Sequence, residues 1–222
     1  MSVATLLHLD ASARSDRSLS RALSERFVAC WTAARPGDAV TRRDLARDPP
    51  PHVTEDWIAA AFTSEAARSP AQRAALAPSD TLIAEVRAAD VIVVGTPMYN
   101  YGLPSTLKAW VDQVIRVDET FTFDLARGAQ PIEPVQTGKV LVTLMSSGEG
   151  QFGRGEASAA ADHVSTQLSA AMRLFGCSHQ RVLRIEWQEF GDARHARSVD
   201  AAHAAVPALT EEVARLLPRG AA

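Results

Sequence analysis

The stretch that decides the fold runs from Asp90 to Arg116 and reads DVIVVGTPMYNYGLPSTLKAWVDQVIR. Residues 91–94 are apolar and β-branched, which predicts a strand buried on both faces, as in a parallel sheet. Residues 95–97 (Gly-Thr-Pro) are expected to end this strand. Pro104 suits the first turn of a helix, because its missing N–H would have no helical partner there. Apolar residues then recur at helical spacing: Leu103, Leu107, Trp110, Val111, Val114 and Ile115.

The loop between this strand and this helix, residues 97–102 (PMYNYG), is a candidate ligand site. Ligands of open α/β sheets bind at the carboxyl ends of the strands. Backbone N–H groups, one amide and two aromatic side chains suit a flat, hydrogen-bonding, electron-accepting ring. The alternative is a turn whose aromatic side chains only pack on the core.

Residues 96–112 (TPMYNYGLPSTLKAWVD) resemble a motif of the FMN-dependent NADH-azoreductases, also called NADH:quinone oxidoreductases. The resemblance extends along nearly the whole chain. It implies a flavodoxin-like fold, bound FMN, NADH or NADPH as the co-substrate, and a homodimer with the active site at the subunit interface. It also implies that Pro97, Met98, Tyr99, Asn100 and Tyr101 line the flavin ring, with the backbone N–H of Asn100 near the reactive N5/O4 edge.

The first strand, residues 3–9, leads into a loop that is rich in serine and arginine. Residues 12–20 contain four serines and two arginines. Ser15 or Ser18 as a helix cap is one interpretation. A phosphate site at the start of the following helix is favoured, because a cap does not need this many polar groups. The family resemblance implies that Ser12, Ser18 and Ser20 and the backbone N–H of Leu19 hold the FMN phosphate.

The rest of the chain alternates strands with helices. A weak edge strand is expected at 39–45, buried strands at 139–145 and 181–186, and helices at 54–68, 70–88, 160–175 and 194–217, the last kinked or restarted at Pro207. Five such strands imply a doubly wound parallel sheet with helices on both faces. We expect one flavodoxin-like FMN-binding domain over residues 1–222, strand order 2-1-3-4-5, and FMN between the first and third strands.

The loop after the fourth strand contains the pattern G-x-G-x-x-G at residues 148–153. A Rossmann dinucleotide site is disfavoured, because the pattern follows the fourth strand and no acidic residue lies about 20 positions further on. A loop that approaches a flat ring edge-on is favoured. By resemblance, Ser146, Ser147, Gly148 and Glu149 contact the pyrimidine side of the flavin. The family often has a basic residue and paired glycines here, so Glu149 either faces the ring or caps the following helix from solvent.

Aromatic residues near the ends of other strands are candidates for the acceptor site. Phe121 and Phe123 lie in a loop over residues 118–124 and either face a pocket or pack under a lid. We assign Phe123 and Asn100 as catalytic residues. Phe152, Trp187 and Phe190 join Phe123 as candidates for the pocket that receives the acceptor.

The composition is that of an ordinary soluble protein. Of 222 residues, 46% are hydrophobic, and the formal net charge is −3, which gives no argument for nucleic acid or an anionic membrane. No signal peptide or stretch of about 20 apolar residues is present. Cys30 and Cys177 are expected as buried free thiols in a reducing compartment, so the cytoplasm is the default location. No histidine pair has zinc spacing, and no metal site is expected.

The sequence therefore predicts an FMN-dependent NAD(P)H oxidoreductase that reduces quinones and aromatic azo compounds by two-electron, ping-pong transfer. One alternative is a flavodoxin-like electron carrier without enzymatic activity, although small carriers tend to be shorter and more acidic. Another is a flavin-free α/β protein whose serine-arginine loop binds a different phosphorylated ligand.

Overall fold

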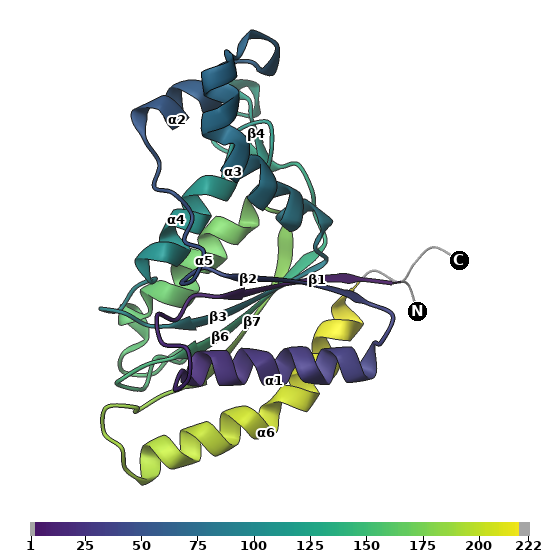
Figure 1. Cartoon of the computed structure of the whole chain (residues 1–222). Coiled ribbons are helices and arrows are strands. Elements are labelled where there is room, and N and C mark those ends of the chain that lie inside the picture. Colours follow the sequence, from purple (N-terminus) through teal and green to yellow (C-terminus); the bar gives the residue numbers. More distant parts are fainter. Residues whose placement is uncertain (1–2, 218–222) are drawn as a thin grey trace.

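The computed structural model describes residues 3–217. A five-stranded parallel sheet lies at its centre (Figure 1), in the order β2-β1-β3-β6-β7. This is the predicted order. The connection after β1 runs to β2 on one side of the sheet, and the connection after β3 runs to β6 on the other side, so the carboxyl ends of β1 and β3 form the switch point. The strands are β1 (Thr5–Asp10), β2 (Ala39–Asp44), β3 (Val91–Pro97), β6 (Lys139–Ser146) and β7 (Cys177–Ile185).

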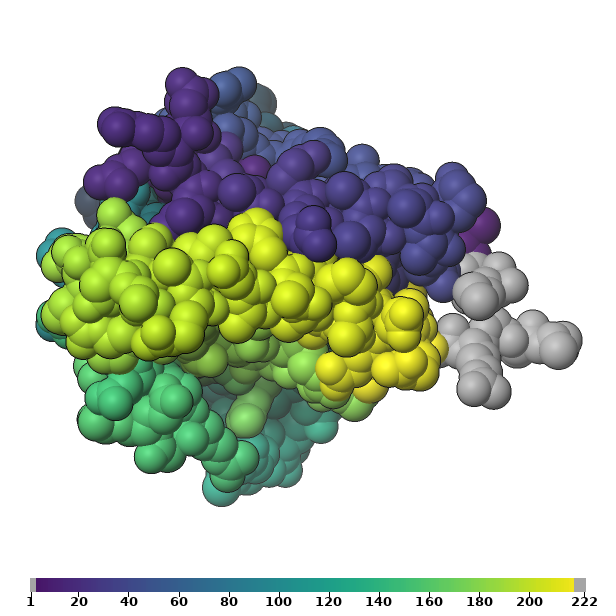
Figure 2. Space-filling view, turned by 90° about the horizontal axis from the view of Figure 1, so that it is seen from below, coloured from purple at the N-terminus to yellow at the C-terminus, as the bar shows by residue number. Residues whose placement is uncertain are grey.

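Helices cover both faces of the sheet (Figure 1). One layer contains α1 (Leu19–Ala34) and α6 (Ala193–Leu216), which lie side by side across the face seen in Figure 2. The other contains α3 (Pro70–Ala88), α4 (Ser105–Val114) and α5 (His163–Arg173). Alternate residues of β3 serve the two layers: Val91 and Val93 belong to the core under α1 and α6, and Ile92 and Val94 to the core under α3, α4 and α5.

The central strand is longer than the sequence predicts. All seven residues of β3 are buried, and the pairing with β6 continues through Gly95, Thr96 and Pro97, which were expected to end it. Gly95 allows α1 to approach, because a Cβ there would lie 2.5 Å from Ser24 Oγ and 2.7 Å from Asp10 Oδ1. The predicted strand end was wrong by these three residues, since parallel pairing to a longer neighbour outweighs the local glycine and proline.

One predicted helix differs from the structure. The helix expected over 54–68 divides into α2 (Glu55–Ala61) and the short 3₁₀ helix η1 (Glu65–Ala67). Of the two alternatives for the last helix, a kink and a restart at Pro207, the structure has the kink: α6 continues through Pro207, and its axis changes direction in its C-terminal part (Figure 1). Proline has no N–H to offer the carbonyl of His203, and Arg26 Nε of α1 donates to that oxygen instead at 3.0 Å.

The segment 118–124 is not only a loop. It contains β4 (Phe121–Phe123), which pairs antiparallel with β5 (Ile132–Pro134). With α2 and η1 this hairpin forms a projection at the top of Figure 1, here called the arm. A cavity of about 870 Å³ lies in the arm, and Phe62 and Phe123 on its walls are 78% and 52% exposed.

The two cysteines are free, as expected, but they are half-buried and not fully buried. Cys177 begins β7, four residues before the predicted start at Arg181, and its burial raises the pKa of its thiol to about 12. Within residues 3–217 no helix is both long and apolar enough to cross a membrane.

Candidate functional site

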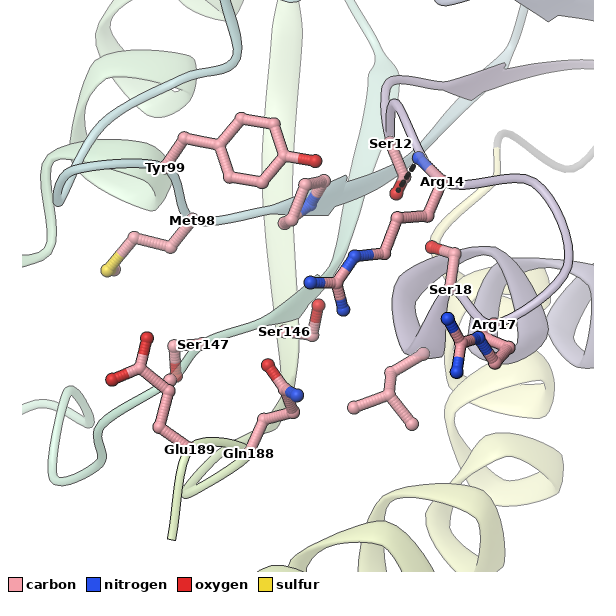
Figure 3. A pocket seen from close by; sticks show the side chains of 13 residues that line it. Ser12, Arg14, Arg17, Ser18, Met98, Tyr99, Ser146, Ser147, Gln188 and Glu189 are labelled. Carbon is pink, nitrogen blue, oxygen red and sulfur yellow. Dashed lines mark hydrogen bonds between the residues drawn. The ribbon is translucent and has the colours of Figure 1, made fainter. Parts of the chain in front are cut away.

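A cavity of about 180 Å³ lies at the carboxyl ends of β1, β3, β6 and β7 (Figure 3). This is the place that the strand order predicts for a ligand. Four segments that are distant in the sequence line it: Ser12, Arg14, Arg17, Ser18 and Leu19 after β1; Pro97, Met98 and Tyr99 after β3; Ser146, Ser147 and Gly148 after β6; and Gln188 and Glu189 after β7.

The start of α1 forms one end of the cavity. Ser18 is the N-cap of α1, and its Oγ accepts from the backbone N–H of Arg21 at 3.3 Å. The N–H of Leu19 lies in the first turn, where no helical carbonyl can accept it. No acidic residue stands in this turn, so nothing there offsets the partial positive charge of the helix terminus.

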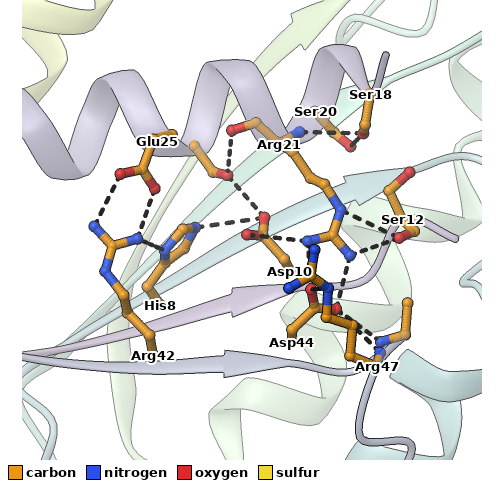
Figure 4. A network of polar contacts seen from close by, with 12 residues as sticks. His8, Asp10, Ser12, Ser18, Ser20, Arg21, Glu25, Arg42, Asp44 and Arg47 are labelled. Carbon is orange, nitrogen blue, oxygen red and sulfur yellow. Dashed lines mark hydrogen bonds and ion pairs between the residues drawn. The ribbon is translucent and has the colours of Figure 1, made fainter. Parts of the chain in front are cut away.

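Arg21 holds the loop that carries Ser12 (Figure 4). Its guanidinium donates to the carbonyl oxygen of Ser12 at 2.7 and 3.2 Å and forms a two-pronged ion pair with Asp44, both N–O distances being 2.7 Å. The hydrogen bond from Arg21 lowers the pKa of Asp44. Because β2 carries Asp44 and the loop after β1 carries Ser12, Arg21 ties two strand ends to α1.

The same network extends along β1 to His8 (Figure 4). Asp10 accepts from Ser24 Oγ at 2.9 Å and lies 3.5 Å from His8 Nε2. Arg42 approaches His8 Nδ1 at 3.1 Å, and arginine can only donate, so Nδ1 is the acceptor and the ring proton is on Nε2, facing Asp10. His8 is therefore the packed strand residue that the sequence predicts.

Arg14 and Arg17 bring positive charge to the same end of the cavity. Both are exposed, and within residues 3–217 neither guanidinium has an ion-pair or hydrogen-bond partner. Figure 3 shows the Arg14 guanidinium pointing into the cavity and Arg17 beside the start of α1. Two unpaired arginines beside a helix terminus create a site that attracts an anion.

The other end of the cavity begins at a tight turn. Tyr99 and Gly102 exchange backbone hydrogen bonds of 3.1 and 2.9 Å around Asn100 and Tyr101. Both central residues have positive φ, 48° and 65°, as a type I′ turn requires. Asparagine tolerates this conformation, whereas tyrosine is strained in it, and such strain is concentrated at functional sites.

Backbone hydrogen bonds join the loop after β6 to the loop after β7. Gln188 N donates to the carbonyl oxygen of Ser147 at 3.2 Å, and Glu189 N to that of Gly148 at 3.1 Å. These bonds carry Gln188 and Glu189 to the cavity. The next α-helix begins only at His163, so the G-x-G-x-x-G pattern does not open a helix as a Rossmann phosphate loop does.

Comparisons with known proteins agree with this geometry. Residues 4–209 match the model of a family with the flavodoxin-like fold. The chain is 43% identical over 216 residues to an FMN-dependent NADH:quinone oxidoreductase 2 of Colwellia psychrerythraea, covering 94% of this chain and 99% of the relative. The chain belongs to the family of FMN-dependent NADH:quinone oxidoreductases.

Other members extend the range of names in this family. An FMN-dependent NAD(P)H:quinone oxidoreductase 1 of Pseudomonas aeruginosa is 39% identical over 205 residues, covering 92% of this chain and 97% of that protein. Among solved structures, an azoreductase from Bacillus anthracis superposes with a TM-score of 0.84 at 21% identity, covering 95% of this chain and all of that one. At this identity the superposition shows a shared fold. The family and fold predicted from residues 96–112 are thus confirmed.

The structure brings most of the predicted FMN-binding residues of this family member to one cavity: Ser12, Ser18, Leu19, Pro97, Met98, Tyr99, Ser146, Ser147 and Gly148. Ser20 is fully buried behind the wall, with its Oγ 3.2 Å from Ser18 Oγ. Asn100 and Tyr101 stand at the turn just outside the lining residues. The FMN-binding roles assigned to all of these residues stay predictions.

Glu149 is not among the residues that line the cavity, so its predicted contact with the flavin stays a prediction. Both of its carboxylate oxygens are 3.3 Å from the Tyr101 hydroxyl, and the charge of Glu149 raises the pKa of Tyr101. The alternative expectation, a cap on the following helix, is wrong, because Asp162 caps α5. The carboxylate that lines the cavity is that of Glu189.

The aromatic candidates for the acceptor pocket are not brought together within one chain. Phe123 lies on the arm and Phe152 is buried. Trp187 and Phe190 pack edge to face at 5.3 Å, with the Arg194 guanidinium over both rings at 4.8 and 4.3 Å. Within residues 3–217 no group of three or more metal-ligating side chains is placed to hold a metal ion.

Four lining residues were not among the predicted site residues: Arg14, Arg17, Gln188 and Glu189. The two arginines had a signal, because they lie among the serines of the phosphate loop. Gln188 and Glu189 had no such signal in the sequence, because only backbone hydrogen bonds to Ser147 and Gly148 bring them to the cavity.

Proposed function

We propose that this protein binds FMN and uses it to transfer two electrons from NADH or NADPH to quinones and aromatic azo compounds. One observation carries the proposal: a cavity at the switch point has an anion-binding end at α1 and, at its other end, a turn that presents backbone N–H groups and aromatic side chains. The names of the closely related proteins support the same activity.

The residues at the anion-binding end fit a phosphate. FMN ends in a phosphate that carries nearly two negative charges at neutral pH. The hydroxyls of Ser12 and Ser18, the N–H of Leu19 and the guanidinium groups of Arg14 and Arg17 all border this end. The donors and charges match the phosphate, so these residues would hold it.

The residues at the other end fit the edge of a flat ring. The turn at 99–102 leaves the backbone N–H of Asn100 outside its own pair of hydrogen bonds, and Gly148 lines the wall beside it. The cavity, about 180 Å³, is smaller than the roughly 300–1,000 Å³ usual for small-molecule sites. The turn at 99–102 would therefore hold the part of the ring that the cavity does not, and Asn100 would offer its backbone N–H to the N5/O4 edge. Bound there, FMN supplies the electron-transfer chemistry, and the protein binds, orients and shields it.

A homodimer would complete this open site. The arm exposes large apolar side chains, and an exposed apolar patch marks a surface that contacts another molecule. Phe123 lies on the arm, away from the cavity of its own chain, so its predicted catalytic role requires the arm of one subunit to cover the site of the other. The dimer thus accounts for the separation of Phe123 from Asn100.

We place the whole activity in one domain over residues 1–222 and locate the protein in the cytoplasm. The two free cysteines support a reducing compartment. Expression with a fluorescent tag, followed by fractionation, tests the location directly.

Steady-state kinetics test the proposed reaction. If donor and acceptor use the same face of the flavin in turn, double-reciprocal plots for NADH and menadione give parallel lines, as in other ping-pong reactions. Excess menadione then competes with NADH. Intersecting lines without this competition would indicate a separate nucleotide site and contradict the shared site.

A further inference from the structure

The two ends of the cavity carry opposite charges. Arg14 and Arg17 stand at the α1 end, and Glu189 stands at the wall formed by the loops after β6 and β7. Figure 3 shows Arg17 and Glu189 on opposite sides of the cavity. Within residues 3–217 Glu189 has no ion-pair partner, so its charge is not neutralised by the protein.

A backbone hydrogen bond and close contact with Gly148 place the exposed Glu189 beside the cavity. Its N–H donates to the carbonyl oxygen of Gly148 at 3.1 Å. The Glu189 side chain folds back over that glycine. A Cβ built on Gly148 would lie only 2.7 Å from Glu189 Cδ and 2.8 Å from Oε1, so the side chain occupies the space that the missing Cβ leaves. In Figure 3 the carboxylate lies next to Ser147 and points toward the side of the cavity formed by Met98 and Tyr99.

A carboxylate in this position would act on the charge of a flavin ring bound in the cavity. A hydride from NADH brings two electrons and one proton, so at neutral pH a reduced flavin ring carries one negative charge that the oxidised ring does not have. A fixed negative charge nearby opposes this gain and leaves the oxidised form unaffected. The two electrons then pass to the acceptor, which takes its protons from the reduced ring and from water.

We propose that Glu189 lowers the reduction potential of the bound flavin and so favours transfer to acceptors that are hard to reduce. The inference rests on the proposed FMN-dependent function. Glu149, the other carboxylate that the sequence allowed to face the ring, is directed at the Tyr101 hydroxyl instead.

The test is the flavin potential of the FMN-loaded protein, measured by equilibration with a redox dye of known potential at low ionic strength. Glu189→Gln should raise the equilibrium constant for reduction about tenfold, which is about 30 mV for a two-electron couple. Glu149→Gln should change this equilibrium constant less than threefold. Glu156→Gln is a matched control, since Glu156 lies outside the cavity and its carboxylate accepts from Gly153 N at 2.7 Å. Salt should reduce the Glu189 effect.

A second readout is the ratio of azo-dye to quinone turnover, which should fall in Glu189→Gln because a higher potential makes the reduced flavin a weaker donor. A potential shift in Glu189→Gln no larger than that in Glu149→Gln overturns the inference. Failure of the wild-type protein to bind FMN would instead overturn the proposed function. If the wild type binds FMN and is reduced by NADH, but Glu189→Gln has an unchanged flavin potential, the proposed FMN-dependent function stands and the role of Glu189 in setting the potential is refuted.

Discussion

Arg21 is the residue on which the geometry of the phosphate end depends. It is the common partner of the Ser12 carbonyl and the Asp44 carboxylate, and its own backbone N–H donates to Ser18 Oγ. One side chain therefore sets the positions of two predicted phosphate ligands. Arg21→Met should reduce FMN affinity and cost about 2 kcal/mol of stability, since it leaves a half-buried carboxylate without its partner.

The same residue predicts a pH dependence of stability. Arg21 lowers the pKa of Asp44 below its usual value of about 3.9, so Asp44 contributes stability above that pH. The contribution is lost as pH falls through the lowered pKa, because the unfolded chain takes up the proton first. The free energy of unfolding, measured with urea between pH 6 and pH 3, should therefore fall less steeply with falling pH in Arg21→Met than in the wild type.

Arg47→Met is the control for this experiment. Arg47 Nε lies 3.4 Å from Asp44, but the Arg47 side chain is 76% exposed, and such a pair contributes at most about 1 kcal/mol. Its pH profile should match that of the wild type. If both variants gave the wild-type slope, Arg21 would not be the group that stabilises the Asp44 carboxylate.

Ser18 allows capping to be separated from phosphate binding. Aspartate caps helices as well as serine does, so Ser18→Asp should leave the far-UV circular dichroism unchanged. Its carboxylate would repel the phosphate and weaken FMN binding at least ~tenfold, measured by fluorescence titration of the apoprotein. Thr54→Asp, at the N-cap of α2 and outside the cavity, should bind FMN normally. Equal affinities in all three proteins would show that Ser18 is only a cap.

At the scale of elements, the turn at 99–102 carries the ring end of the site. Asn100→Gly keeps a positive φ without strain, whereas Asn100→Val puts a β-branched residue at φ 48°, which costs about 1–2 kcal/mol. If the backbone N–H of residue 100 contacts the flavin, Asn100→Gly should keep its FMN affinity, and Asn100→Val should lose about tenfold. A similar loss in Asn100→Gly would mean that the side-chain amide makes the contact.

The buried strands of the sheet could be predicted because parallel strands leave continuous apolar runs in the sequence. The ends of elements could not. β4 and β5 have three residues each, too few to show an alternation. β7 begins at Cys177 within a polar, half-exposed stretch whose pairing to β6 has no local signal.

The residues of the candidate site likewise divide into those that the sequence could predict and those that it could not. Ser12 and Ser18 could be predicted because they lie in the serine-rich loop that joins β1 to α1. Ser20 belongs to the same serine-rich stretch, but the helix turns its hydroxyl inward to Ser18. Glu189 could not be predicted, because its place depends on its hydrogen bond to Gly148, a residue 41 positions earlier in the chain.

At the scale of the whole molecule, the exposed apolar side chains of the arm lead us to expect that two chains form a dimer. Phe123 is 52% exposed on the arm, so Phe123→Asp should place a charge in the proposed interface. Sedimentation equilibrium should find the wild type as a dimer, and Phe123→Asp should raise the dimer dissociation constant at least ~tenfold, because burying an unpaired charge is costly. Val3→Asp, at a 73% exposed position near the N-terminus, should leave the dimer intact. A monomeric wild type would contradict this arrangement.

The measurement that tests the central claim most directly is an anaerobic titration of the purified protein, followed by its visible absorbance. The account predicts a yellow protein with one FMN released per chain on denaturation. One equivalent of NADH should bleach the flavin, and one equivalent of menadione should restore the colour. A colourless protein that added FMN fails to reconstitute, or a yellow one that neither NADH nor NADPH bleaches, would contradict the account.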